Sequence, residues 1–276
     1  MIEKIAVTDI TRMKPPFICI AGVYNDGRSV RPLMKGKRFD QNWCQRNGFV
    51  IKPFSVIELD FLEPRPTPPH TEDYYINPHH VVWVSQLDVE KKRQLLKMMD
   101  DGCVANIFGA ELLSKENQKA KYIQTGSGNR SLGTIRPKSI QHFHYRQYEH
   151  CWDYRLAFTD QCGEEYQVKI VDLSFQSMMD YQRVVQGFSP RQVEQYAMDH
   201  IFGVEDLYLR LGLARGFADY PDCCFLQITG VYPIPDYLGD SSFLTLLHAI
   251  DAERGEDCGE DISIGDDDLS YDDIPF

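Results

Sequence analysis

The sequence predicts a mainly β protein with inserted helices, of the α+β class, made of two small antiparallel modules and a disordered acidic tail. Three observations support this fold class. Stretches that alternate apolar and polar residues, or that are apolar throughout, recur in residues 1–65 and again from residue 131. Helical patterns with capping residues interrupt these stretches. The acidic residues concentrate at the C-terminus, where residues 251–276 hold eleven acidic side chains and one basic side chain.

The first module is predicted over residues 1–115. Residues 3–10 alternate apolar and polar side chains and residues 16–24 form an apolar run, so both are expected to be strands. The Asp26-Gly27 pair that follows suits the positive backbone angles of a tight hairpin. A further strand is expected over residues 54–64, and the prolines after it should end the sheet because proline removes a ladder donor.

A helix and a loop are expected next. The apolar residues of 85–102 keep a helical spacing, with Ser85 and Asp88 as the capping pair. Residues 114–130 are polar and are expected to form a loop. The glycines of this loop lack the Lys-Ser/Thr ending of a phosphate-binding loop, so we expect no nucleotide site there.

The second module is predicted over residues 116–250. Strands are expected over 131–145, 154–160, 165–175, 206–215 and 224–232, and helices over 175–187, 189–202 and 241–250. Ser189 followed by Pro190 is a favoured helix start. Gly27–Leu33 and Gly133–Ser139 share a glycine, a β-branched residue and an Arg-Pro pair, which indicates either a duplicated module or a chance match.

The composition is that of a folded soluble protein, with 43% hydrophobic and 25% charged residues. No apolar run approaches the ~18 residues of a membrane span, and the N-terminus lacks a signal-peptide core, so we expect a cytoplasmic protein that contacts no membrane. The eight cysteines form no Cys-x-x-Cys pair and are expected to stay reduced. His142 and His144 share a strand face close to His150 and Cys151, but no second ligand pair exists. We therefore predict no metal and no cofactor.

The net charge of -12 belongs mostly to the tail, because residues 1–250 hold 28 basic and 30 acidic side chains. A nearly neutral body can still carry a local basic groove. The tail ends in three apolar residues behind two acidic ones. Such an end can dock into a pocket with a basic rim, and its predicted partner-binding residues are Asp272, Asp273, Ile274, Pro275 and Phe276.

These five residues resemble the C-terminal tip of the bacterial single-stranded DNA-binding protein family (SSB), in which an acidic run closes in Asp-Asp-Ile-Pro-Phe. In that family the tip recruits replication, recombination and repair proteins, and the resemblance implies the same here. The body resembles prokaryotic dual-OB-domain proteins through residues 27–33, 209–217 and 226–238. This second resemblance implies that each module is an OB-like antiparallel β-barrel.

OB-folds bind single strands through a basic groove and aromatic rings that stack on bases. Basic and aromatic residues interleave in two clusters, although each could instead be a solvated strand face with aromatic core partners. The first cluster is Arg28, Arg31, Lys35, Arg38 and Trp43. The second is Arg136, Lys138, His144, Tyr145, Arg146, Trp152 and Arg155. Arg210 and Arg215 are further candidates, or else surface ion-pair partners.

The sequence thus predicts a non-enzymatic protein that binds single-stranded DNA, with RNA as an alternative ligand, and recruits DNA-processing proteins through its tip. A second hypothesis is an interaction adaptor, or a decoy of SSB tips, in a prokaryotic defence system. A third is a metal-dependent nuclease that uses Asp160, Glu165 and Lys169, although carboxylates beside a hairpin are usually solvated turn residues.

Overall fold

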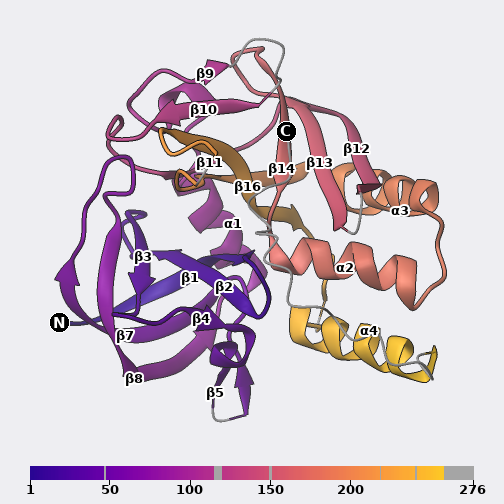
Figure 1. The fold of residues 1–276 in the computed structure, drawn as a ribbon, viewed down its shortest axis with the longest axis horizontal. Helices are drawn as coiled ribbons and strands as arrows, with labels where there is room; N and C mark the ends of the chain where they lie inside the picture. The colour runs from indigo at the N-terminus through magenta and orange to yellow at the C-terminus, as the bar shows by residue number, and fades with distance from the viewer. Residues whose placement is uncertain (47, 115–119, 149–150, 218, 240, 258–276) are drawn as a thin grey trace.

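A computed structural model describes residues 1–276 except 47, 115–119, 149–150, 218, 240 and 258–276. Two β units lie side by side, each around its own hydrophobic core (Figure 1). The predicted module boundary at residue 115 falls outside the described residues. In the part of the chain that the structure describes, no helix is both long and apolar enough to cross a membrane.

The first unit is a closed barrel. Its strands are β1 (Ile2–Arg12), β2 (Phe17–Val23), β3 (Ser29–Leu33), β7 (Ser55–Pro64) and β8 (Asp73–Gln86). They pair in the order β1-β2-β3-β8-β7, and β7 returns to β1. Only the β3–β8 pair in this circuit is parallel. As predicted, the β2–β3 turn uses Gly27, whose φ is +81°.

The sequence predicted that the sheet ends at Pro64, and this prediction is wrong. The prolines occupy the loop between β7 and β8, and the chain then returns antiparallel to β7 as β8. The predicted helix follows as α1 (Val89–Met98). Its cap is Asp88, whose side chain accepts a hydrogen bond from the Lys91 N–H, whereas Ser85 pairs with Val56 inside the sheet.

The connector between β3 and β7 contains only short elements. These are β4 (Phe39–Asp40), the 3-10 helix η1 (Gln41–Cys44), β5 (Gln45–Arg46) and β6 (Phe49–Val50). β4 pairs with β2, and β5 pairs with β6 as a small hairpin. Figure 1 shows this hairpin at the lower edge of the first barrel, away from the second unit.

The second unit is a curled half-barrel with the same strand order. Its strands are β11 (Leu132–Ile135), β12 (Ser139–Tyr148), β13 (Cys151–Thr159), β14 (Glu165–Ile170), β15 (Asp206–Leu213) and β16 (Cys223–Ile234). They follow the order β12-β13-β14-β16-β15, with β14 parallel to β16. In the described pairings β15 continues to β11 rather than to β12, so this sheet stays open.

Two expectations for this unit need correction. Residues 114–130 are not only a loop, because β10 (Lys121–Gln124) pairs with β16 and with β9 (Leu113–Ser114). The strand expected over 131–145 is broken into β11 and β12 at Arg136-Pro137. The repeated Arg-Pro pairs therefore occupy different places, one in β3 and one after the additional strand β11, so their match does not reflect a duplication of equivalent strands.

Helices separate β14 from β15. They are α2 (Leu173–Val184) and α3 (Pro190–Ala197), and α3 continues into the π-helical segment η3 (Met198–Phe202). α3 begins with the predicted Ser189 cap as part of a capping box. α2 is capped by buried Asp172, which also accepts the N–H of Val231 at 2.9 Å and so ties α2 to β16. Burial raises the pKa of Asp172 to about 7.

The last helix, α4 (Phe243–Asp257), packs beside α2 (Figure 1). It continues beyond residue 250, so the prediction of disorder from residue 251 is wrong for 251–257. The partner-binding tip, residues 272–276, lies outside the described residues.

One disulfide contradicts the expectation that all thiols stay reduced. It joins Cys103, just before the 3-10 helix η2 (Val104–Asn106), to Cys162 in the β13–β14 turn. Fifty-nine positions separate the two cysteines in sequence, so local spacing could not reveal the pair. The fold brings them together where the segment after α1 meets the β13–β14 turn.

Candidate nucleic-acid interface

The outer face of the second sheet places basic side chains in a row. His144 of β12 pairs with Arg155 of β13, Arg155 with Lys169 of β14, and Lys169 with Gln227 of β16. Alternate residues of the same strands fill the core, including Phe143, Tyr154, Leu156 and Val168. Because side chains alternate between the faces of a strand, the row lies on the opposite, outer face.

The row contains an ion-paired arginine and a titratable histidine. Arg155 donates to the Asp153 carboxylate at 2.7 Å, and both side chains are about one-fifth exposed. The rings of His142 and His144 lie 4.1 Å apart, and an Arg146 guanidinium nitrogen lies 3.3 Å from His144 Nδ1. Burial, with His142 and Arg146 nearby, lowers the pKa of His144 and so favours the neutral form of this ring. His150, part of the rejected metal site, lies outside the described residues.

Two aromatic candidates of the second cluster lie inside the sheet. Tyr145 is buried, and its hydroxyl donates to Asp180 at 2.8 Å and accepts from Arg183 at 2.6 Å. Burial raises the pKa of Tyr145. Trp152 is half-buried, with its ring stacked on Tyr145 at 4.4 Å and contacted by Arg183. The burial of Tyr145 does not support its predicted contact with nucleic acid. Its ring packs in the core, and its hydroxyl belongs to an ion-pair network.

Arg136 and Lys138 line a separate cavity of about 400 Å³, at the open side of the half-barrel near β12 and β15. The Arg136 guanidinium donates to the Glu205 carbonyl at 3.0 Å and lies 3.7 Å from the Asp206 carboxylate. The structure therefore divides the second cluster between this cavity and the outer row.

The first cluster is also divided. Arg28 is exposed and paired with Asp26 at 2.7 Å, and Lys35 and Arg38 are exposed on the connector. Trp43 is buried, with its ring 4.7 Å from Phe39 in the first core. This burial does not support the predicted contact of Trp43 with nucleic acid.

Arg31 is buried because the second unit covers the outer face of β3. Its guanidinium donates to Asp73 at 3.1 Å, to the Ser131 hydroxyl at 2.7 Å and to His70 Nδ1 at 3.0 Å. Glu72 lies 3.4 Å away and also accepts the Ser131 N–H. Arg31 therefore joins the two units instead of facing solvent, and its burial does not support the predicted contact with nucleic acid.

A second buried network lies beside the first. Arg210 of β15 is 2% exposed and donates to Asp9 of β1 at 3.2 Å and to Ser29 of β3 at 2.7 Å. Thr229 also donates to Asp9. Arg215, whose side chain is 51% exposed, pairs instead with Asp73 of the first network. Arg210 was predicted to be a nucleic-acid contact or a surface ion-pair partner, and the structure shows it in an ion pair that is buried. Its partners come from residues that are far apart in sequence, so no local pattern indicated this interface.

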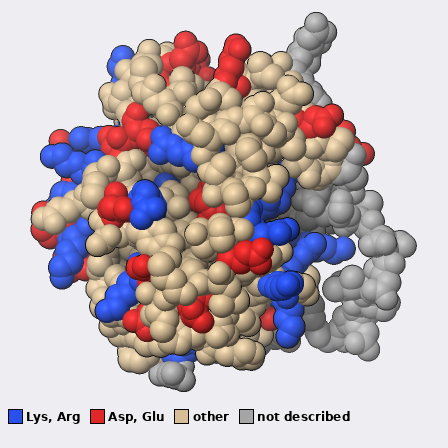
Figure 2. Space-filling model, turned by 90° about the vertical axis from the view of Figure 1, so that its left-hand side faces the viewer, with Lys and Arg blue, Asp and Glu red and all other residues tan. Residues whose placement is uncertain are grey.

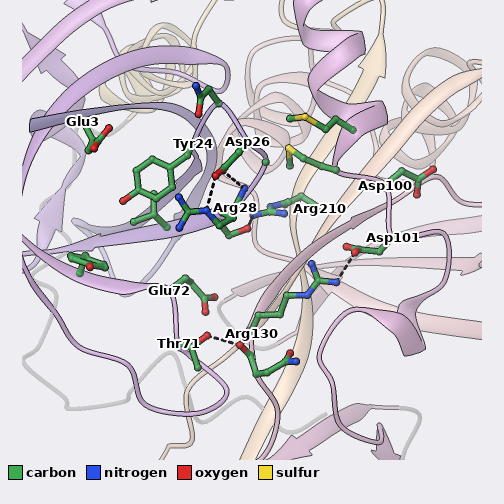
Figure 3. Close-up of a pocket in the computed structure, with 18 of the residues that line it drawn as sticks. Glu3, Tyr24, Asp26, Arg28, Thr71, Glu72, Asp100, Asp101, Arg130 and Arg210 are labelled. Atoms are coloured by element: carbon green, nitrogen blue, oxygen red, sulfur yellow. Dashed lines mark hydrogen bonds and ion pairs between the residues drawn. The ribbon is translucent and has the colours of Figure 1, made fainter.

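A cleft of about 630 Å³ opens between the units (Figure 3). Arg28, Arg130 and Arg210 line it, and Arg130 pairs with Asp101 at 2.5 Å. The carboxylates in the lining outnumber these guanidinium groups; they are Glu3, Asp26, Glu72, Asp100 and Asp101. Figure 2 shows the same mixture over the side that carries the N-terminus, where basic and acidic side chains are interspersed. This cleft does not favour a phosphodiester backbone.

The nuclease hypothesis used Asp160 together with Glu165 and Lys169. Asp160 is fully buried rather than solvated, whereas Glu165 is exposed. Its carboxylate accepts the N–H groups of Val104, Cys162 and Glu164 at 2.9–3.1 Å. Asp160 thus organises the hairpin turn. Over the described ranges, the one three-residue group with metal-ligand spacing is Cys103, Asp160 and Cys162, and there the two sulfurs form the disulfide.

A family model described as a dual OB-containing domain matches residues 11–231. The matched range runs from the end of β1 into β16, so it spans both β units and the buried networks between them except for Asp9. The match and the two strand orders confirm the predicted pair of OB-like barrels. No curated protein matches the chain.

Proposed function

Because the chain belongs to the family of dual OB-containing domains, we propose that it binds single-stranded DNA on the outer face of β12, β13 and β14. OB-fold domains generally bind nucleic acid, often through the second and third strands of the barrel. In the second unit these strands are β13 and β14. The observation that carries the proposal is the row of His144, Arg155 and Lys169 across three neighbouring strands.

The geometry of the row suits an extended strand. Neighbouring positions across a sheet lie about 4.8 Å apart, so a nucleic-acid backbone that crosses the sheet meets all three side chains. The arginine and the lysine neutralise phosphates, and the neutral His144 ring offers a surface for a base or a sugar. The proposal contains no catalytic step, since the Asp160 carboxylate is fully engaged by backbone N–H groups.

The test is fluorescence anisotropy of labelled oligo-dT with the full-length protein over a series of salt concentrations. We expect binding that weakens with salt. The slope of log K against log salt concentration should fall in magnitude by about 1.4 when Arg155→Gln and Lys169→Gln together remove two phosphate contacts. At 0.1 M salt this double variant should bind roughly tenfold or more weakly. Lys97→Gln, at the exposed end of α1, is the matched control and should bind like the unmodified protein.

Three results would contradict the proposal. They are an absence of binding to oligo-dT at low salt, equal binding of the double variant and the unmodified protein, and equal binding of duplex DNA. Tighter binding of oligo-rU than of oligo-dT would assign the site to RNA instead.

The tip is proposed to recruit proteins that recognise SSB C-termini. The support for this is the sequence Asp272–Phe276, which combines two carboxylates with a terminal apolar group. In a pull-down with a protein that binds SSB tips, Phe276→Ala should abolish capture, while the oligo-dT affinity stays unchanged. Capture of the variant at the level of the unmodified chain would refute this role.

A further inference from the structure

The first barrel carries an exposed aromatic ring that is held in place from one side. Phe49 is 47% exposed, and its ring lies parallel to that of Trp83, with centroids 4.2 Å apart and planes 4° apart. Trp83 is half-buried against the core of the first barrel. Such an ordered ring loses little conformational freedom when a base stacks on it.

The segment around this ring is basic. Met34–Lys52 holds one acidic residue, Asp40, and five basic ones: Lys35, Lys37, Arg38, Arg46 and Lys52. The Asp40 carboxylate caps η1 by accepting the Trp43 N–H at 3.0 Å. In a chain of net charge -12, this segment is a local concentration of positive charge.

Two of the arginines lie against aromatic rings. Arg46 is the cross-strand partner of Phe49, and its guanidinium lies 5.1 Å from the Trp43 ring. The Arg38 guanidinium lies 5.5 Å from the Phe17 ring. Within the described ranges, neither arginine has a carboxylate at ion-pair distance. Among the described residues, both charges are therefore unpaired by carboxylates, unlike Arg155, which is paired with Asp153.

We propose that the connector lobe, defined as Met34–Arg46 and Gly48–Lys52 together with Trp83, is a second contact for the single-stranded DNA. Phe49 stacks on an unpaired base, and Arg38 and Arg46 contact the adjoining phosphates. This inference rests on the proposed function and extends it from one barrel to both. A duplex does not suit the lobe, because its bases are already stacked on one another.

The position of the lobe explains why it is needed. The outer face of β3 is covered by the second unit, so the first barrel cannot use that face for a strand. The connector leaves β3 and runs to the lower edge of the barrel (Figure 1). Its Lys35, Arg38 and Phe49 side chains are exposed there. The second unit has α2 and α3 at the corresponding point between its third and fourth strands.

The experiment uses the full-length protein and oligo-dT strands that contain one 2-aminopurine, whose fluorescence reports stacking. Phe49→Ala should weaken binding of a long strand about 5- to 150-fold, the range expected for the loss of one stacked base. Phe49→Trp keeps an aromatic plane and should restore both the affinity and the fluorescence change. Leu62→Ala removes another exposed apolar side chain of the first barrel, 61% exposed, and should change neither.

Strand length separates this inference from the proposed function. An oligonucleotide too short to extend beyond the second sheet should bind Phe49→Ala and the unmodified protein with equal affinity. A long oligonucleotide should bind Phe49→Ala more weakly. If Phe49→Ala binds long strands as tightly as the unmodified protein, while Arg155→Gln with Lys169→Gln weakens binding, the lobe is refuted and the proposed function stands. If the unmodified protein binds no strand, both are refuted. Circular dichroism melting verifies that each variant is folded.

Discussion

The outer faces of the two β units have the same strand order and opposite environments. In the first unit, Arg31 of the third strand is buried in a network with Asp73, His70 and Ser131. In the second unit, Arg155 and Lys169 of the second and third strands lie at the surface, each partly exposed. Equivalent strands therefore differ in their surroundings, since one face joins the units and the other stays partly exposed.

The largest expected effect is a loss of stability when the face that joins the units is disrupted. Arg210→Ala removes the buried partner of Asp9 and leaves a carboxylate without its counter-charge, which costs about 3–5 kcal/mol of unfolding free energy. Denaturant unfolding measures this loss. Arg28→Ala removes an exposed ion pair and should change the stability by less than about 1 kcal/mol. Equal stability of Arg210→Ala and the unmodified protein would show that the network does not join the units.

The next effect concerns pH at the same interface. Burial, together with Arg31 and Arg215, lowers the pKa of His70 to about 3. Between pH 6.5 and 3 the unfolded chain binds a proton that the folded protein does not, so acid destabilises the fold. At pH 5 this contribution is about 2 kcal/mol. His70→Asn keeps an acceptor for Arg31 and should remove this part of the pH dependence.

Asp172 acts in the opposite direction, because its raised pKa favours the folded state as pH falls. The difference between the unfolding free energies of the unmodified protein and His70→Asn, measured from pH 7 to pH 5, isolates the histidine. A difference that does not change with pH would contradict the assignment.

The smallest expected effect is a change in oligo-dT affinity at the open face. Asp153 is paired with Arg155 and competes with a phosphate for that guanidinium. Because a partly exposed ion pair contributes at most about 1 kcal/mol, Asp153→Asn should tighten oligo-dT binding by up to about fivefold. Anisotropy titrations at fixed salt measure the change. Weaker binding of this variant would mean that Asp153 orients Arg155 for the strand rather than competing for it.

The sequence predicted the elements that depend on local patterns. Alternation placed β1, and the Ser189-Pro190 pair placed the start of α3. β8 was missed because its central residues, Asn77-Pro78-His79-His80, lack a simple alternation, and the pairing with β7 is interrupted by three register shifts. Tertiary pairing decides such a strand, and a single sequence does not display it.

The candidate site was predicted in part for the same reason. Proximity of basic and aromatic residues in sequence identified Arg155 but could not distinguish it from Arg31, since burial depends on a contact with Ser131, one hundred positions away. Phe49 was not selected, although an aromatic residue in a basic stretch was visible in the sequence. Lys169 was considered only for catalysis, and strand register alone shows that it lies beside Arg155.

The most direct test of the contrast between the two faces is photo-crosslinking of oligo-dT that carries 5-iodouracil, with the attachment sites mapped by mass spectrometry. We predict crosslinks within residues 142–169, at the open face, and none to residues 29–33. Crosslinks concentrated on residues 29–33 would contradict the account, because they would mean that the DNA reaches a face that the second unit covers.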